Sequence, residues 1–197
     1  MKAFFTSGEP LKQRRFTREK KIYRLLGRIP SLMEKDSQFR LLSINIGPEK
    51  GPDFIGLNKK GHLILGEVKA GSLRNDAWTQ VKTYGKKYMK MRQKELEQIV
   101  SRGGTYKSLC NAYKGFLSKT AQMALLNPSR RRLQFVLVAE RFSDGVLNKI
   151  NSRNMGYKLR NAVKDIKCLE VCCFKIGAGK TIAVAKIILG SKRKLSR

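Results

Sequence analysis

Two apolar runs of strand length, separated by one polar turn, constrain the fold of this chain more than any other feature. The first run covers residues 53–57 and follows Pro52, and the second covers residues 62–69. The turn between them, Asn58-Lys59-Lys60-Gly61, is polar and contains a glycine. This pattern is typical of a β-hairpin. We therefore expect two adjacent antiparallel strands in this stretch.

Charged side chains sit at defined places on this hairpin. Side chains two positions apart in a strand share a face, so Glu67 and Lys69 point the same way. A hairpin of this length brings Asp53 across from Glu67. Two carboxylates beside a lysine can hold Mg²⁺, or Mn²⁺, together with its waters. The alternative is an ordinary salt-bridged hairpin.

A helix is predicted directly after the hairpin, with Asn75-Asp76 as its N-terminal cap. Gln80 and Tyr84 are four positions apart and therefore share one helix face. The helix is expected to reach about residue 100, because its apolar residues recur with a helical period: Trp78, Val81, Tyr84, Tyr88 and Met91. A packed tyrosine and a capped amide would explain Gln80 and Tyr84 equally well.

With these motifs the chain resembles the PD-(D/E)XK nuclease superfamily, in its RecB-like branch with a Gln-x-x-x-Tyr motif, and is similar to archaeal mismatch-type endonuclease catalytic domains. The resemblance covers roughly residues 15–90 and one later strand. The matching motifs are Pro52-Asp53, Glu67-Val68-Lys69 and Gln80-Val81-Lys82-Thr83-Tyr84, with Glu19 as the upstream helix glutamate. It implies an α/β, restriction-endonuclease-like αβββαβ core with a central mixed sheet, a helical insertion at about 100–132 and a C-terminal β-hairpin.

The resemblance also implies a metal site and catalytic roles. Phosphodiester hydrolysis must place a water in line and offset negative charge, and a divalent metal does both. Asp53 and Glu67 would ligate Mg²⁺, with the Val68 carbonyl as a third ligand, and Glu19 would ligate through water or hold a second ion. Lys69 would orient the attacking water or offset charge at the phosphate, and two nearby carboxylates favour its charged form. Gln80 and Tyr84 would position Lys69 or a phosphate oxygen.

A length of 197 residues and a hydrophobic content of 41% suit one domain. We expect it at residues 17–189, between a basic arm at 1–16, irregular up to Thr17, and a basic tail at 190–197. The expected helices lie at 17–26, 75–100, 106–126 and 143–151, with one more around Leu159, Ala162, Val163 and Ile166. The expected strands lie at 39–46, 53–57, 62–69, 133–138, 167–176 and 181–189, and 133–138 is apolar enough to be buried on both faces. The insertion at 100–132 is either a solvated helical hairpin or a basic platform for a phosphate backbone.

The net charge of the chain indicates what kind of partner it binds. The chain has 43 Lys+Arg against 14 Asp+Glu, a formal net charge of +29. A compact protein with this self-repulsion fits a polyanion, so we expect nucleic acid, above all DNA, as its partner. A non-catalytic basic binding protein, a junction-resolving nuclease and an RNA-cutting nuclease are the alternatives, and a homodimer or larger complex stays open. The expected nucleic-acid contacts are Lys82, Lys86, Lys87, Lys90, Arg130, Arg131 and Arg132.

Other classes are disfavoured. The apolar stretch at residues 3–5 is too short for a signal peptide, and Lys186 interrupts the run at 181–189, so we expect an intracellular protein of the cytoplasm or nucleoid, without a membrane partner. The run Gly177-Ala178-Gly179-Lys180-Thr181 is similar to a phosphate-binding loop, but Phe174 stands where that loop requires a glycine. We therefore expect no binding of a nucleoside triphosphate. The cysteine spacing favours free, buried thiols over a metal cluster: Cys110, Cys168, Cys172 and Cys173.

Overall fold

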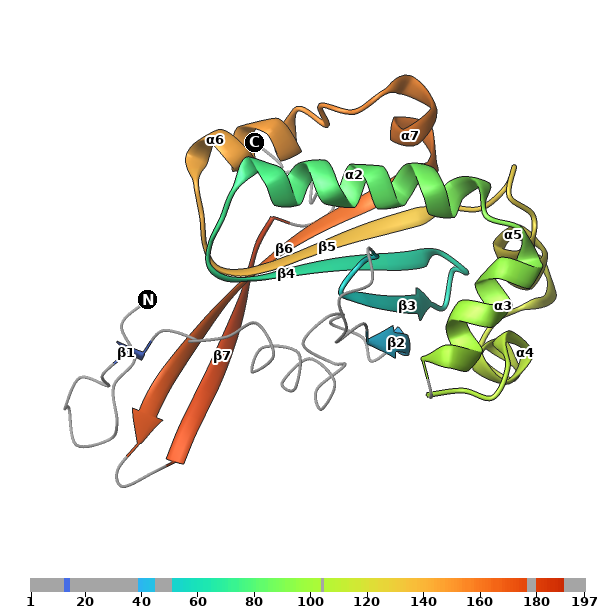
Figure 1. Cartoon of the computed structure of the whole chain (residues 1–197), viewed down its shortest axis with the longest axis horizontal. Coiled ribbons are helices and arrows are strands. Elements are labelled where there is room, and N and C mark those ends of the chain that lie inside the picture. Colours follow the sequence, from blue (N-terminus) through green and yellow to red (C-terminus); the bar gives the residue numbers. More distant parts are fainter. Residues whose placement is uncertain (1–12, 15–38, 45–50, 104, 177–179, 190–197) are drawn as a thin grey trace, which may run out of the picture.

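The computed structural model describes residues 13–14, 39–44, 51–103, 105–176 and 180–189, which form an α/β fold around one mixed sheet (Figure 1). The strands are β1 (Gln13–Arg14), β2 (Phe39–Ile44), β3 (Phe54–Asn58), β4 (Leu63–Leu73), β5 (Leu133–Phe142), β6 (Val163–Ile176) and β7 (Lys180–Leu189). The helices are α2 (Asn75–Lys90), α3 (Gln93–Arg102), α4 (Leu109–Tyr113), α5 (Lys119–Leu126), α6 (Asp144–Asn151) and α7 (Tyr157–Ala162).

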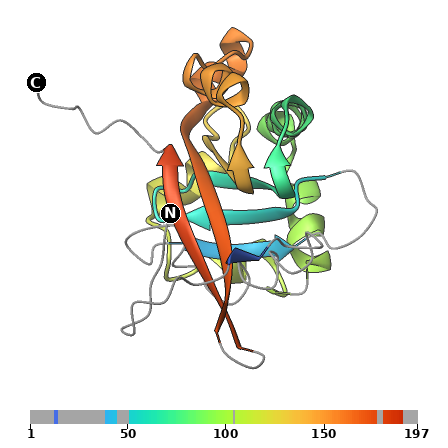
Figure 2. The ribbon, with the colours of Figure 1, turned by 90° about the vertical axis from the view of Figure 1, so that its left-hand side faces the viewer.

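The strands lie in the order β1-β6-β5-β4-β3-β2, and β7 pairs with β6. The strands β2, β3 and β4 are antiparallel neighbours, which confirms the predicted hairpin, whereas β4, β5 and β6 are parallel. Parallel neighbours require crossover connections, and helices supply both of them here. Figure 2 shows α2, α6 and α7 together over one face of the sheet.

Alternation along β4 separates two cores. Leu63 and Leu65 belong to the core under α2, while Ile64 and Val68 belong to a second apolar cluster on the opposite face. The residues of β5 from Leu133 to Glu140 are all buried, as the apolar run at 133–138 predicts for a strand covered on both sides. A side chain on β4 therefore faces α2 at every odd-numbered position from 63 to 69.

Gly85 lets α2 lie close against β5. A Cβ at Gly85 would come within 2.6 Å of Cζ of Phe135, so any larger residue would push the helix away from the sheet. Trp78, one of the largest buried side chains, meets the same Phe135 ring edge-on with centroids 6.2 Å apart. This close packing fixes the height of α2 above β4 and so the position of its polar residues.

The long helix predicted at 75–100 is wrong, because it is two helices, α2 and α3, that break at Met91. The backbone of Met91 is extended, with φ −61° and ψ 132°. Arg131 donates from Nη1 to the carbonyls of Tyr88 and Met91 at 2.7 and 2.6 Å, which satisfies the end of α2. Glu95 Oε2 then accepts the Arg92 N–H at 2.6 Å and starts α3. The break depends on a residue far away in sequence.

The helix predicted at 106–126 is also divided. Ser108 and Ser118 each accept a backbone N–H with the side chain and so begin α4 and α5 separately. Gly115 between them adopts φ +67°, a conformation that ends a helix. Val163 and Ile166, predicted to be helical, belong to β6 instead and pair with β5. Their apolar spacing suits a buried strand as well as a helix.

Several predictions fall at or beyond the limits of the described residues. The arm at 1–16 is not irregular throughout, since Gln13 and Arg14 pair with β6. The helix predicted at 17–26, with Glu19, lies outside the described residues, and so does the tail at 190–197. The strand β7 begins directly at Lys180 and runs antiparallel to β6, so the glycine-rich run leads into a strand and not into a helix. Among the described helices, none has both the length and the apolar character needed to cross a membrane.

Candidate active site

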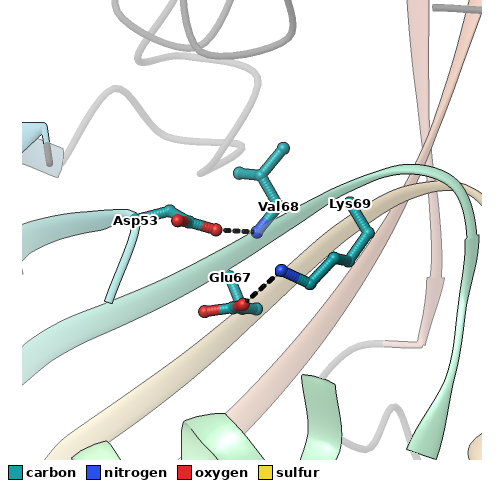
Figure 3. A network of polar contacts seen from close by, with 4 residues as sticks. All are labelled: Asp53, Glu67, Val68 and Lys69. Atoms are coloured by element: carbon teal, nitrogen blue, oxygen red, sulfur yellow. Dashed lines mark hydrogen bonds and ion pairs between the residues drawn. The ribbon is translucent and has the colours of Figure 1, made fainter. Parts of the chain in front are cut away.

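Asp53 lies beside β4 at the point where β3 begins. Phe54 pairs with Gly66, and the Asp53 N–H donates to the Gly66 carbonyl at 2.9 Å. The Asp53 side chain then reaches two residues further along β4, where its Oδ2 accepts the Val68 N–H at 2.6 Å (Figure 3). The hairpin register therefore holds the Asp53 carboxylate next to the Glu67-Val68-Lys69 tripeptide, as the sequence predicts.

Glu67 and Lys69 form a close ion pair on the α2-facing side of β4. Lys69 Nζ lies 2.8 Å from Glu67 Oε1, and the two side chains are 23% and 3% exposed. A carboxylate this deeply buried needs a compensating positive charge. We call Asp53, Glu67 and Lys69 the carboxylate–lysine cluster; it carries two formal negative charges and one positive charge (Figure 3).

The helix α2 brings Tyr84 to this cluster. Burial raises the pKa of Tyr84 above its ordinary value of 10.0, the negative charges of Glu67 and Asp53 raise it further, and Lys69 opposes them. The phenol is therefore protonated at neutral pH and available as a hydrogen-bond donor. Gln80 is an exposed residue one turn earlier on the same helix face. Glu19, the remaining member of the predicted set, lies outside the described residues.

The carboxylate–lysine cluster offers oxygen donors of the kind that magnesium prefers in proteins. Among the residues that the structure describes, no three His, Cys, Asp or Glu side chains gather into a metal-binding group. Mg²⁺ needs fewer, because it commonly binds through one or two carboxylates and keeps several waters. Asp53 and Glu67 supply two carboxylates from adjacent strands. The backbone of Val68 is directed to the same place, since N–H and C=O of a strand residue point to one side and its N–H donates to Asp53.

A pocket opens next to Lys69, where β4 ends. Its volume is about 370 Å³, and Lys69, Gly71 and Arg74 are among the residues that line it. Gly71 adopts φ +80°, and its N–H donates to Glu140 Oε2 at 2.8 Å. Sequence reasoning missed Arg74 and Glu140. Glu140 could have been found from the sequence, because it is a charged residue directly after a long apolar run. No sequence pattern distinguishes Arg74.

The predicted basic contacts divide into exposed and buried groups. Lys86, Lys87, Lys90 and Arg130 are exposed. Lys82 is partly buried, with Nζ 5.5 Å from the centre of the Trp78 ring and 3.4 Å from the Asn154 carbonyl. Arg132 is partly buried as well.

Arg131 is the buried member of this set. It is only 1% exposed, although the sequence predicts it as a nucleic-acid contact. Its guanidinium donates to backbone carbonyls at the ends of α2 and α5, so its first role is structural. Three consecutive arginines in a turn gave no sign that the middle one points inward.

The cysteines follow the prediction in part. Cys168 is free and buried, and burial raises its pKa to about 12, which keeps its thiol protonated. Cys172 is buried as well. Cys110 is free but exposed, contrary to the expectation of buried thiols. Its exposure follows from its place on the short helix α4, which buries Leu109 and Ala112 instead.

The fold and the site together define an α/β protein with a mixed sheet and a partly buried carboxylate–lysine cluster at the junction of β3, β4 and α2. No protein-family model, no curated protein and no solved structure matches the chain.

Proposed function

We propose that this protein is a metal-dependent endonuclease that hydrolyses phosphodiester bonds in DNA, with an αβββαβ core of the PD-(D/E)XK type. The observation that carries the proposal is the meeting of Asp53, Glu67 and Lys69, with the Lys69 Nζ 2.8 Å from the Glu67 Oε1. Residues from two strands and a helix converge on this point. The formal net charge of +29 supports a polyanionic substrate.

Asp53 and Glu67 would hold the metal, with the Val68 carbonyl as a further ligand. A bound Mg²⁺ or Mn²⁺ would supply charge neutralisation at the phosphate and a more acidic water. The two carboxylates are held in place by the Val68 N–H and by Lys69. Such fixed groups need no reorganisation when charge develops during the reaction.

Lys69 and Tyr84 would act on the phosphate as donors. Lys69 is held in its charged form by Glu67, so it would offset negative charge or orient a water and not abstract a proton. Tyr84 stays protonated because of burial and the nearby carboxylates, and it would donate to a phosphate oxygen or to Lys69. The pocket beside Lys69 and Arg74 gives a phosphate room to approach.

A substrate panel tests this function. Labelled single-stranded, duplex and branched DNA and single-stranded RNA would each be incubated with the full chain in Mg²⁺, in Mn²⁺ and in EDTA. We expect cleavage of at least one DNA form in either metal and none in EDTA. A protein that binds these nucleic acids but cuts none of them in either metal would be a non-catalytic binding protein, and cleavage of RNA alone would change the substrate class.

A further inference from the structure

A second cavity lies at the C-terminal end of α2, away from the carboxylate–lysine cluster. Its volume is about 620 Å³, within the range of ligand pockets. Its walls come from the end of α2, the turn at 128–132 and α7, which lies beside α2 (Figure 1). We call it the basic cavity, because four of its lining residues are cations: Lys90, Arg131, Arg132 and Lys158.

The charge of the basic cavity is one-sided. None of the residues that line it is acidic, and Ser129 and Asn161 add neutral polar groups. Cations that converge on a concave surface raise the local potential more than the same charges spread over a convex one. The chemistry that fits such a cavity is a phosphate group.

Arg131 points to a ligand independently of the surface lysines. The residue is 1% exposed, and its Nε donates to the Leu125 carbonyl at 2.8 Å while Nη1 donates to Tyr88 and Met91. Nη2 is buried and has no hydrogen-bond partner among the described residues. A buried donor without a partner is costly, and a ligand oxygen that enters the cavity deeply enough would supply the missing acceptor. Three carbonyl contacts fix the guanidinium of Arg131, a residue that lines the cavity.

Tyr157 adds an aromatic surface to the same cavity. It lines the cavity and is nevertheless 78% exposed, an unusual place for a large ring. An exposed ring beside cations is a platform on which a base can stack while its phosphate meets the charges. A bare phosphate would contact only the cations, and a purely apolar ligand would contact only the Tyr157 ring.

We propose that the basic cavity binds one nucleotide unit, with its phosphate toward Arg131, Lys90 and Lys158 and its base on Tyr157. The proposal deepens the proposed function and rests on it for the ligand class. Six positions of α2 separate Lys90 from Tyr84, about 9 Å along the helix axis at ~1.5 Å per residue. The unit would come either from a nucleic-acid strand held outside the carboxylate–lysine cluster or from a free nucleotide.

Binding in EDTA tests the proposal without any cleavage. The probes are a short labelled single-stranded DNA and adenosine monophosphate, and the protein is the full chain. The double variant Lys90→Ala/Lys158→Ala removes two exposed cations of the cavity, and Lys107→Ala/Lys149→Ala removes two exposed lysines elsewhere. Both variants lower the formal net charge from +29 by the same two units.

We expect the cavity variant to weaken DNA binding by about tenfold or more and to lower the log–log salt slope by about 0.7, because the cavity holds one phosphate and each phosphate contact of a single strand contributes about 0.7. The control variant should stay within about twofold of wild type, as expected for rim charges. Tyr157→Ala should cost about another tenfold, the size of one lost base stack, while Tyr157→Phe should retain binding. An equal loss in cavity and control variants would overturn the proposal.

The two probes separate the sources of the ligand. Adenosine monophosphate that binds wild type and loses affinity in the cavity variant identifies a free nucleotide, whereas a loss seen only with DNA identifies a strand. A wild-type protein that cuts no substrate but shows these binding losses would refute the proposed nuclease activity and leave the basic cavity standing. If neither probe distinguished the cavity variant from the control, the basic cavity would be a surface feature and nothing more.

Discussion

The carboxylate–lysine cluster and the basic cavity both depend on α2, and they treat a buried charge in opposite ways. In the cluster, the buried Glu67 carboxylate has a cation, Lys69, at 2.8 Å. In the cavity, the buried Arg131 guanidinium bonds to neutral carbonyls, and its Nη2 has no partner among the described residues. Excess negative charge in the first favours a metal ion, and excess positive charge in the second favours a phosphate.

The contrast between Glu67 and Arg131 shows that the sign of the buried charge varies within a strongly basic chain. Among the lysines and arginines whose side chains the structure describes, most are exposed, such as Lys86 and Lys87, and they provide a general attraction for a polyanion. Under the two proposals, the carboxylate–lysine cluster and the basic cavity would add fixed positions for a cation and for an anion, which the general field does not provide. Variants of single residues at each site should therefore have larger and more distinct effects than variants of the exposed lysines.

The largest effect on stability is expected at Arg131. Arg131→Met would remove the donors to Leu125, Tyr88 and Met91 and leave buried carbonyls without partners. We expect the free energy of unfolding to fall by about 3–5 kcal/mol. Arg130→Met, at the exposed neighbour, should change it by less than about 0.5 kcal/mol. Urea unfolding of the two variants measures this, and equal small losses would show that Arg131 does not hold the two helix ends.

Lys69 is expected to have the next largest effect. Lys69→Met would leave the buried Glu67 carboxylate without its closest cation. We expect a loss of about 2–3 kcal/mol in the free energy of unfolding, less than for a fully buried pair because Lys69 is partly exposed.

The matching double variant is the control for the ion pair. Lys69→Met/Glu67→Gln removes both charges, so it should recover about half or more of the stability lost in Lys69→Met. A double-mutant cycle from urea unfolding gives the coupling between the two residues. Strictly additive losses would mean that the 2.8 Å contact contributes no coupling.

Comparing the prediction with the structure shows which physical information a sequence carries. The hairpin, the buried strand β5 and the shared face of Glu67 and Lys69 follow from alternation, which depends only on neighbours in the chain. The face shared by Gln80 and Tyr84 follows from helical period in the same way. These local rules suffice to predict the faces on which Glu67, Lys69 and Tyr84 lie in the candidate site.

The remaining features depend on contacts between distant segments. The end of α2 is set by Arg131, a residue that lies on the far side of α3, α4 and α5 in the sequence. The basic cavity likewise joins Lys90 to Ser129 and Lys158, whose spacing follows no period. Val163 and Ile166 were misassigned because a short apolar run fits a helix and a buried strand equally well. In each case tertiary packing decides between local alternatives.

A smaller effect on stability is expected at His62, which lies among positively charged side chains. The pKa of His62 is lowered from 6.5 to about 4, mainly because the ring is buried. The nearby cations Lys60, Lys164 and Arg132 lower the pKa further. The folded protein therefore keeps His62 neutral, while the unfolded chain protonates below about pH 6.5. The contribution to stability is complete above that pH and is lost as the pH falls toward 4.

His62→Gln should remove this pH dependence. Between pH 6.5 and 4, wild type should lose on the order of 2 kcal/mol more stability than the variant, after allowance for solvent screening. The chain has a single histidine, so an NMR titration of its ring is unambiguous. Arg132→Gln should raise the His62 pKa by a fraction of a unit, and a pKa near 6.5 in wild type would contradict the account of this region.

The most direct test of the central claim compares cleavage with binding in a single pair of variants. Asp53→Asn removes a proposed metal ligand but keeps an oxygen that can accept the Val68 N–H. Asp144→Asn changes the net charge by the same amount at an exposed position on α6. Cleavage in Mg²⁺ and DNA binding in EDTA would be measured for both variants and for wild type.

The account predicts that Asp53→Asn binds DNA in EDTA as wild type does but cuts it about a thousandfold or more slowly in Mg²⁺, the size expected when a group that stabilises transition-state charge is lost. Asp144→Asn should match wild type in both measurements. Cleavage by Asp53→Asn at the wild-type rate, or a wild-type protein inert in both Mg²⁺ and Mn²⁺, would contradict the assignment of the carboxylate–lysine cluster as the catalytic site.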